Sequence, residues 1–248
     1  MTMFRKVVRK TLNVPLRLGG FELQRRGETG STKSYIPFRE TIRDAAKAGV
    51  PVGDYIDAKH QVPGATQATI DQLTELGVLG EKIHSVCEIG PGSGRYLEKV
   101  QRLCTPCSYE IYETDKEWSD WLTHTYQVTA RDADGTSLRR TVSGSMDLVH
   151  AHKVFVCLPT IVTCGYFNEM IRVARRGASI VFDIVSELCM DEAMVEKWIA
   201  SAIYYPSLLP RDFVINFFAR RQCVLRASFF ATMRPGKSEY LVFVKDGA

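Results

Sequence analysis

The sequence of 248 residues predicts an α/β protein with a Rossmann-like, mostly parallel seven-stranded sheet. From residue 84 onward, short apolar runs alternate with helical segments, which is typical of right-handed βαβ units on a parallel sheet. A glycine-rich turn joins the first apolar run to the first helix. Two β-rich runs near the end are separated by a short turn, which favours an antiparallel hairpin. We therefore expect a parallel sheet that ends in an antiparallel C-terminal hairpin.

The individual elements follow from these patterns. Helices are expected at residues 95–103, through Trp118 and Trp121, and at residues 165–174. The hairpin is expected from residues 224–232 and 239–245, with residues 234–237 as its turn. Four short apolar runs suit strands that are buried on both faces: 85–89, 108–112, 146–151 and 179–184.

The residues before position 84 form an N-terminal extension in two parts. Residues 1–26 predict a basic amphipathic helix, with Phe4 and Leu12 on its apolar face and four cations between them. Such a helix could lie on an anionic membrane surface, or it could pack on the domain or on a partner subunit. Residues 27–83 begin with a polar linker and then read as a helical lead-in. We expect this lead-in to act as a lid over the main domain, residues 84–248.

Composition narrows the class of protein. Hydrophobic residues make up 45% of the chain and charged residues 24%, as in ordinary globular proteins, and a net charge of +4 is too small to indicate nucleic-acid binding. No apolar run approaches the roughly 20 residues that span a bilayer. The seven scattered cysteines favour free thiols in a reducing cytosol, and the single pair Cys104 and Cys107 lacks the second pair of a zinc site. The expected location is cytoplasmic, with peripheral contact at the inner face of the membrane left open.

The most specific local pattern is the turn that contains Gly90, Gly92 and Gly94. Glycines at this spacing allow a tight turn between strand and helix and a close approach of the backbone to a ligand. The position that would hold the third glycine of a dinucleotide fingerprint is Arg95. An acidic residue, Glu88, precedes the first glycine by two positions.

This acid-x-Gly-x-Gly-x-Gly pattern resembles the first motif of class I methyltransferases that use S-adenosylmethionine (SAM), and the resemblance continues for most of residues 84–245. It implies SAM as the cofactor, bound at the glycine turn together with Glu88. It also implies that Glu113, just after the second strand, holds the ribose hydroxyls. The loop at Asp134 and Gly135 matches the place of the acid that binds the adenine amino group, with Asp132 as the close rival.

Residues 146–152, which resemble the fourth strand of this family and its end, contain the candidate catalytic residues. Ligands of open α/β sheets bind at the C-terminal ends of the strands, where His150 and His152 lie. A spacing of two places both side chains on one face of an ideal strand. A neutral imidazole suits the removal of a proton from a hydroxyl acceptor, so His152 is the preferred general base and His150 the second candidate. Either histidine could instead only pack near the cofactor. The two could also bind a metal with Asp183, but the expectation is that no metal is present.

Several segments together resemble sugar O-methyltransferases of bacterial surface-polysaccharide pathways: the basic N-terminus, the lead-in containing 35–38, the glycine turn and residues 150–155. This implies a glycan or another small polar molecule as the acceptor. N-methylation of a small amine and a SAM-binding protein without catalysis remain alternatives, and the methylated atom and the oligomeric state are left open. Residues 152–155 lack the motif of nucleobase amino methyltransferases, so no nucleic-acid partner is expected. Residues 30–80 and 189–211 would form the lid, where Trp198, Tyr204 and Tyr205 could stack on a sugar or pack in the core.

Overall fold

The computed structural model describes residues 36–201 and 206–246, and within them seven strands form one sheet in the order β3-β2-β1-β4-β5-β7-β6. Neighbouring strands from β3 to β5 are parallel, whereas β7 runs antiparallel to both β5 and β6. The strands are β1 Ser85–Ile89, β2 Ser108–Tyr112, β3 Thr129–Ala130, β4 Met146–Ala151, β5 Ala174–Ile184, β6 Cys223–Met233 and β7 Gly236–Lys245. The predicted mostly parallel sheet with a C-terminal antiparallel hairpin is confirmed.

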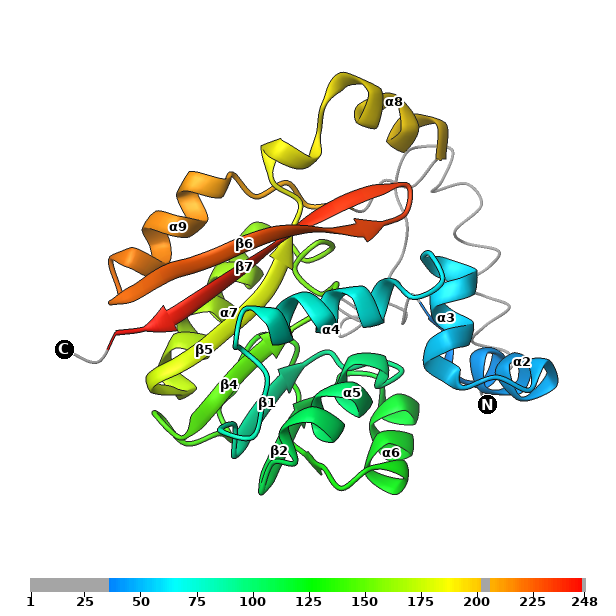
Figure 1. Ribbon diagram of the computed structural model, residues 1–248, viewed down its shortest axis with the longest axis horizontal. Helices are drawn as coiled ribbons and strands as arrows, with labels where there is room; N and C mark the ends of the chain where they lie inside the picture. Colours follow the sequence, from blue (N-terminus) through cyan, green and yellow to red (C-terminus); the bar gives the residue numbers. More distant parts are fainter. Residues whose placement is uncertain (1–35, 202–205, 247–248) are drawn as a thin grey trace, which may run out of the picture. The chain divides into compact units, whose positions relative to one another are not determined.

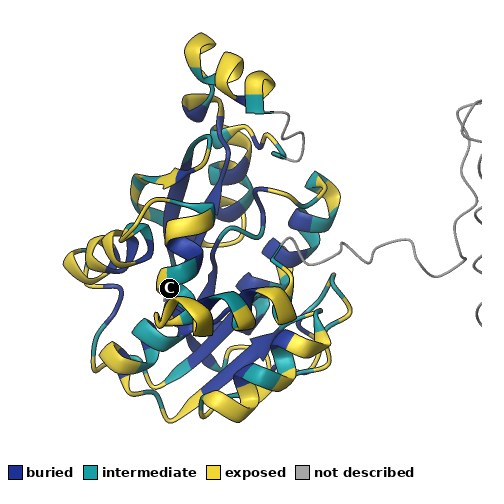
Figure 2. Cartoon of the chain, turned by 90° about the vertical axis from the view of Figure 1, so that its right-hand side faces the viewer, coloured by how far each residue is buried: buried dark blue, intermediate teal, exposed yellow. Residues whose placement is uncertain are grey.

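Helices cover both faces of this sheet, which makes three layers (Figures 1 and 2). On one face, Leu73 and Leu97 pack with the strands in an apolar core, and on the other face Phe167 and Phe218 do so. The helices are α2 Phe38–Ala48, α3 Val52–His60, α4 Ala65–Glu75, α5 Arg95–Cys104, α6 Lys116–Thr125, α7 Thr160–Val173, α8 Glu192–Ser201 and α9 Arg211–Ala219, with a 3₁₀ turn, η1, at Glu187–Cys189.

Three elements differ from their expected bounds. Strand β3 is unexpected, because both of its residues are exposed and carry no apolar signal. Helix α7 begins five residues before Gly165, a residue that lowers helix propensity but here lies against the carbonyl of Thr136. Strand β5 begins at Ala174 rather than at residue 179, and its pairing with β4 changes register between Met146 and Leu148. The exposed, basic start of β5 hides this extension from an apolar pattern.

The helical lead-in belongs to the same compact unit as the sheet, from Ile36 to the end of the chain. The indole of Trp118 in α6 donates a hydrogen bond of 2.9 Å to the carbonyl of Ile36, and the ring of Phe38 packs edge-on against it. The side chain of Asp115 caps α6 by accepting from the backbone amides of Glu117 and Trp118. These contacts hold the start of the lead-in beside α6.

The predicted amphipathic helix of residues 1–26 lies outside the described residues, as do Tyr204 and Tyr205 of the predicted lid. In the described part of the chain, no helix has the length and apolar character that crossing a membrane requires. Trp198 of α8 is buried in a small apolar cluster with Val185 and Met233, which agrees with the packing alternative for this residue.

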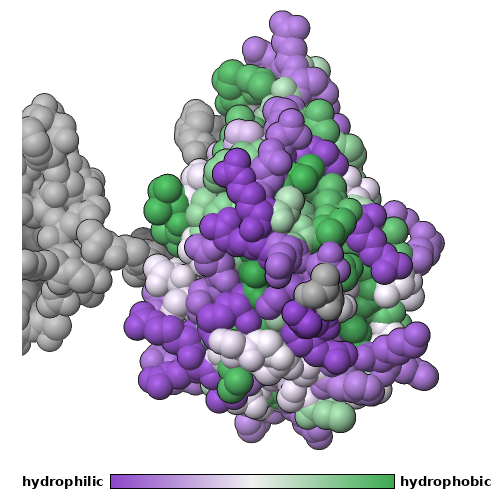
Figure 3. All heavy atoms as spheres, turned by 90° about the vertical axis from the view of Figure 1, so that its left-hand side faces the viewer, coloured by the Kyte–Doolittle hydropathy of each residue, from purple (hydrophilic) through white to green (hydrophobic). Residues whose placement is uncertain are grey.

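The outer surface mixes polar and apolar residues. Figure 3 views the side that carries α9 and the start of β6, where hydrophobic patches lie between hydrophilic ones. Phe213 of α9 and Val224 of β6 are among the exposed apolar side chains, at 44% and 57% exposure. Scattered exposed apolar residues are normal for a globular protein and need no partner to explain them.

Candidate functional site

The glycine-rich turn follows β1 and leads directly into α5, as predicted. Gly90, Gly92 and Gly94 all have positive φ angles, of 61°, 53° and 71°. A Cβ atom at Gly90 would lie 2.8 Å from the side chain of Val154, and one at Gly94 would lie 2.6 Å from Leu122. Both conformation and space therefore require glycine at these two positions, and conformation alone favours it at Gly92.

Glu113 lies directly after β2, with its carboxylate turned to the glycine turn. One oxygen accepts a hydrogen bond of 2.8 Å from the amide of Gly92, and the other accepts one of 2.8 Å from the amide of Asp115. Burial raises the pKa of Glu113 above its ordinary value, while these amide hydrogen bonds act in the opposite direction. The two contacts fix the carboxylate beside the turn, in the place where the resemblance puts a ribose-binding acid.

Asp134 organises its own loop. Its carboxylate accepts from the amides of Thr136 and Ser137 at 2.8 Å each, from both of their hydroxyls, and from the guanidinium of Arg139. Burial opposes ionisation, but these hydrogen bonds lower the pKa of Asp134 well below its usual range. The carboxylate is thus occupied by protein groups, so contact of its oxygens with adenine stays a prediction.

The Asp134 loop lies beside the segment that follows β2 and contains Glu113. A Cβ at Gly135, which has a φ of 76°, would lie 3.7 Å from Thr114, the residue after Glu113. The rival residue, Asp132, is exposed and lies 3.7 Å from Arg140 in an ion pair. The structure therefore brings the Asp134 loop, rather than the Asp132 side chain, into contact with the segment that follows β2.

Glu88 and His150 are direct cross-strand neighbours on the face covered by α5. Each is 1% exposed. The hydroxyl of Tyr109 in β2 donates a 2.6 Å hydrogen bond to Glu88 and lies 3.1 Å from Nε2 of His150. Burial raises the pKa of Glu88 to about 8 and lowers that of His150 to about 3. Glu88 is therefore a buried acid beneath the turn, without a described charge partner closer than the 3.9 Å contact to His150.

His152 lies on the same face as His150, in agreement with their spacing. Its Nε2 is 2.9 Å from Nδ1 of His150, and its Nδ1 is 3.0 Å from the hydroxyl of Tyr240. Its ring stacks on Tyr96 of α5 at a centroid distance of 3.8 Å. Burial lowers the pKa of His152 well below its ordinary value, and the neighbouring His150 adds to the effect. Because both ring nitrogens have protein partners, this arrangement leaves His152 no free nitrogen for direct proton removal, and that role stays a prediction.

Sequence reasoning missed Lys153, which follows the histidines. Its backbone has a φ of 60°, which is rare for a residue with a side chain and occurs often at functional sites. Its amide donates 2.7 Å to one oxygen of Asp183, while its ammonium lies 3.0 Å from the other oxygen and 2.6 Å from the hydroxyl of Ser238. Asp183 is fully buried. Lys153 and Asp183 thus form a buried ion pair at the place where β4, β5 and β7 meet. No sequence motif predicts this pair.

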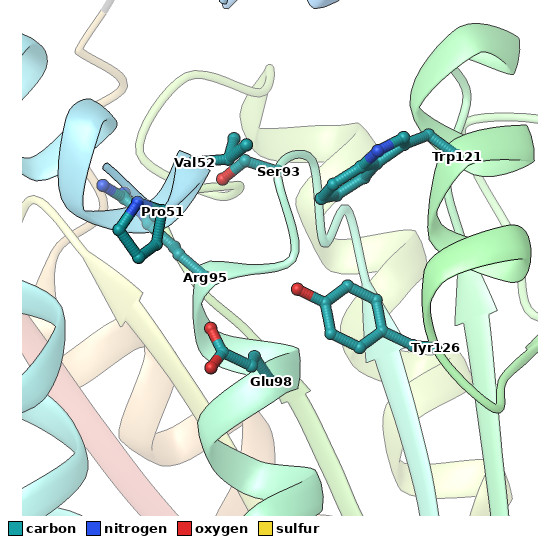
Figure 4. Close-up of a pocket in the computed structure, with 8 residues that line it drawn as sticks. Pro51, Val52, Ser93, Arg95, Glu98, Trp121 and Tyr126 are labelled. Carbon is teal, nitrogen blue, oxygen red and sulfur yellow. The ribbon is translucent and has the colours of Figure 1, made fainter. Parts of the chain in front are cut away.

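A pocket of about 290 Å³ lies beside the glycine turn, between the starts of α3 and α5 and the C-terminal part of α6 (Figure 4). Trp121 and Tyr126 form one wall, and Glu98 and Arg95 lie across from them. The rest of the lining comes from Ser93 and from the start of α3: Pro51, Val52 and Gly53. Trp121 contacts both Trp118 and Tyr126 edge to face, so the aromatic wall is held in place. Neither Glu113 nor Asp134 lines this pocket, but Ser93 of the glycine turn does, so the pocket adjoins the expected cofactor site.

Arg95 is fixed by the lead-in. Its guanidinium donates 2.9 Å to Asp57 of α3, and both side chains are buried. Asp57 also accepts from the amide and the hydroxyl of Thr66. The lead-in predicted as a lid is therefore tied by a buried ion pair to the first residue of α5. Among the described residues, no group of three His, Cys, Asp or Glu side chains is arranged to hold a metal ion.

The sequence matches no protein-family model and no curated protein. The structure resembles magnesium protoporphyrin IX methyltransferase from Synechocystis PCC 6803 with bound SAH, with a TM-score of 0.58 and 14% identity over 98% of this chain and all of that one. It also resembles an O-methyltransferase family protein from Burkholderia thailandensis (TM-score 0.55, 14% identity, 79% of this chain, 60% of that one). A third likeness is to a SAM-dependent methyltransferase from Methanosarcina mazei (TM-score 0.55, 10% identity, 70% and 97%).

These likenesses, at low identity, establish the fold. The chain has the Rossmann-like fold of class I SAM-dependent methyltransferases, in which the seventh strand is antiparallel.

Proposed function

We propose that the protein is a SAM-dependent methyltransferase that acts on a hydroxyl group of a sugar, a glycan or another small polar molecule. The observation that carries the proposal is the contact between Glu113 and the amide of Gly92 in a protein of this fold. It joins the strand-end acid to the glycine turn, and both belong to the pattern that binds SAM in the family this sequence resembles.

The residues around the turn fit the cofactor. Gly92 leaves open space where a Cβ would stand, so a ligand could approach its backbone closely. The Glu113 carboxylate can accept two hydrogen bonds from a ribose diol, because each oxygen has more than one acceptor site. When bound, SAM supplies a methyl group on a positively charged sulfur. Glu88, at the end of β1, would place a carboxyl group directly beneath the glycine turn that binds the cofactor.

The pocket beside the turn supports a ringed polar acceptor. Trp121 and Tyr126 offer aromatic surface on which a sugar ring can lie, and Glu98 offers an acceptor for hydroxyl groups. Its volume lies at the lower end of the range for small-molecule sites, about 300–1,000 Å³, and suits a group the size of one sugar unit. In this proposal the lead-in, through Pro51 to Gly53, forms the acceptor-side wall.

Titration calorimetry with SAH tests the cofactor. The wild type should bind it, and Glu113→Ala should weaken the affinity by at least about tenfold, because a charged hydrogen-bonding group is lost. Glu117→Ala, which removes an exposed carboxylate in the first turn of α6, is the matched control and should leave the affinity unchanged. Binding of NAD in place of SAH would overturn the proposal.

A screen with methyl-labelled SAM against glycans, small amines and RNA tests the acceptor. Labelling of a hydroxyl-bearing glycan or small molecule supports the proposal, whereas labelling of amines or RNA alone contradicts it. If SAH binds but no acceptor is labelled, a SAM-binding protein without catalysis is favoured. For a labelled acceptor, Trp121→Ala should raise KM at least about tenfold and leave SAH affinity within about threefold, since Trp121 lies across the pocket from the glycine turn and Glu113 does not line it.

A further inference from the structure

Six buried side chains form an unbroken line of hydrogen-bonding contacts through the core. Starting from Glu88, the line passes to Tyr109 at 2.6 Å, to His150 at 3.1 Å and to His152 at 2.9 Å. It continues to the hydroxyl of Tyr240 at 3.0 Å and ends at the hydroxyl of Tyr96 at 3.4 Å. The six residues come from β1, β2, β4, β7, α5 and the residue after β4.

The placement follows from the register of the sheet. Glu88 and His150 are paired on adjacent strands, and His152 is two residues beyond His150, so all three side chains lie on the face under α5. Tyr109 and Tyr240 belong to the apolar cluster on that same face, together with Tyr96. A line of polar groups within an apolar core is costly unless every member has a partner, and here every member has one.

The contact between the two imidazoles couples their tautomers. A neutral imidazole has one donor and one acceptor nitrogen, and the 2.9 Å contact between Nδ1 of His150 and Nε2 of His152 needs one proton. If His152 carries its proton on Nε2, then His150 must accept at Nδ1 and carries its own proton on Nε2. In the alternative, both rings carry the proton on Nδ1. The two histidines therefore change tautomer together or not at all.

The state of Glu88 selects between these arrangements. An ionised Glu88 can only accept, so the hydroxyl of Tyr109 donates to it and must accept from Nε2–H of His150. Both rings are then protonated on Nε2, and Tyr240 donates to Nδ1 of His152. When Glu88 is protonated it can donate to Tyr109, and every bond in the line can reverse, with both rings protonated on Nδ1.

We propose that Glu88, Tyr109, His150, His152, Tyr240 and Tyr96 form a proton relay, in which Glu88 gains or loses the proton and the two histidines exchange tautomers without becoming charged. The purpose of the relay rests on the proposed methyl transfer to a hydroxyl. The acceptor O–H bond breaks and its proton goes to Tyr96, while each member passes its own proton to the next. The last proton forms the O–H bond of Glu88, so the acceptor loses one proton and Glu88 gains one.

The direction of transfer follows from the chemistry of the two ends. An ionised carboxylate can only accept a proton, so protons move from Tyr96 toward Glu88. Both ends are buried, with Tyr96 4% and Glu88 1% exposed. Tyr96 itself does not line the pocket of Figure 4, although its neighbour Arg95 does.

Charged groups face the relay from several elements. Glu113 raises the pKa of Glu88, while Tyr109 lowers it through its hydrogen bond, and burial is the largest influence. Lys153 and Arg95 oppose protonation of His152, after burial and His150. Asp183 raises the pKa of Tyr240, again after burial. These surroundings keep both imidazole rings and the hydroxyls of Tyr109 and Tyr240 neutral, while the pKa of Glu88 is about 8.

NMR of the full-length protein with ¹⁵N-labelled histidine tests the relay. Between pH 6 and pH 10, His150 and His152 should pass from the Nδ1–H to the Nε2–H tautomer with one common midpoint, both rings staying neutral. Glu88→Gln should abolish this transition, because the terminal group no longer ionises. Tyr109→Phe should also abolish it by breaking the line next to Glu88. Tyr112→Phe is the matched control: its buried hydroxyl on the same strand contacts Thr141 outside the relay, so the transition should remain.

The relay is overturned if the wild-type histidines hold fixed or opposite tautomers over this range, if either ring becomes charged, or if the transition survives Tyr109→Phe. The wild-type spectrum alone decides the question should a variant fail to fold. SAH calorimetry on the same samples separates the two proposals. Coupled tautomers without SAH binding contradict the methyltransferase proposal alone, and SAH binding without coupling contradicts the relay alone.

Discussion

Two regions at the C-terminal edge of the parallel strands are held together in different ways: the expected cofactor site, and the region where β4, β5 and β7 meet. At the glycine turn and the loops at Glu113 and Asp134, side chains bond mainly to backbone amides within their own loop or the adjoining one. At the ends of β4, β5 and β7, side chains bond to one another across the sheet, as Lys153 does with Asp183 and Ser238. The first region is therefore held by contacts within and between neighbouring loops, whereas the second depends on the packed core.

This comparison predicts that changes in the second region have the larger cost in folding. Asp183→Ala leaves the ammonium of Lys153 without its buried carboxylate, so we expect a loss of about 3–5 kcal/mol in the free energy of unfolding. Urea denaturation measures this. Asp120→Ala removes the partner of Lys116 in an exposed pair and should cause little change. Equal effects of the two substitutions would contradict the larger contribution to folding that we expect from the buried pair between β4 and β5.

Glu88 should make stability depend on pH. Its folded pKa of about 8 exceeds the ordinary value of 4.5, so the folded state binds more protons than the unfolded state between these values. Above about pH 6.5, where unfolded histidine no longer titrates, stability should thus fall as pH rises to about 9, by about 2 kcal/mol at about 1.4 kcal/mol per pKa unit. Thermal unfolding across this range should show the loss in wild type and a much flatter profile in Glu88→Gln. A wild-type profile as flat as that of the variant would show that Glu88 is not held neutral by the fold.

Below that range the histidines should have the opposite effect. The folded pKa of His150 is about 3 and that of His152 is also lowered, whereas unfolded histidine titrates near 6.5. The unfolded state then binds more protons at acidic pH, so stability should rise as pH increases toward 6.5. Together with Glu88 this predicts a stability maximum near pH 6.5, which the same thermal scans would locate. A maximum above pH 8 would contradict the neutral, buried state of both groups.

Within the glycine turn, two substitutions distinguish the cost of a steric clash from the cost of a positive φ angle. Gly94→Ala places a Cβ 2.6 Å from Leu122 and should cost about 2–3 kcal/mol of unfolding free energy. Gly92→Ala has no atom within 4 Å of the new Cβ and should cost only about 1 kcal/mol, from its positive φ. Urea denaturation of the pair provides the measurement. If Gly92→Ala proves the more damaging to folding, the packing of α6 against the turn is not what restricts Gly94.

The smallest expected effect is at the Asp134 loop. Asp134→Ala removes an acceptor of two backbone amides, as at a helix cap, and should cost about 1 kcal/mol. Asp132→Ala, which removes only an exposed ion pair at 3.7 Å, is the control and should cause no measurable change in urea denaturation. A larger loss for Asp132→Ala would show that Asp132, rather than Asp134, stabilises this loop.

The sequence by itself determined the order of β1, α5, β2, α6, β4, α7 and β5, the antiparallel hairpin and the glycine turn with Glu113 beside it, but not β3, α8 or α9. These features depend on local patterns: apolar runs of strand length, and glycines where the backbone needs positive φ. It also placed His150 and His152 on one face, because that follows from the repeat of two residues in a strand.

Only the tertiary structure decided which groups those histidines meet. His152 contacts Tyr240, 88 positions later in the chain, and Lys153 contacts Asp183 and Ser238, 30 and 85 positions later. The pairing of β4 with β1 and the antiparallel placement of β7 beside β5 create these contacts, and no pattern within one segment encodes them. A histidine read alone looks like a free base of ordinary pKa. Burial and two hydrogen-bonding partners turn it into a neutral link, because charge is costly in the core.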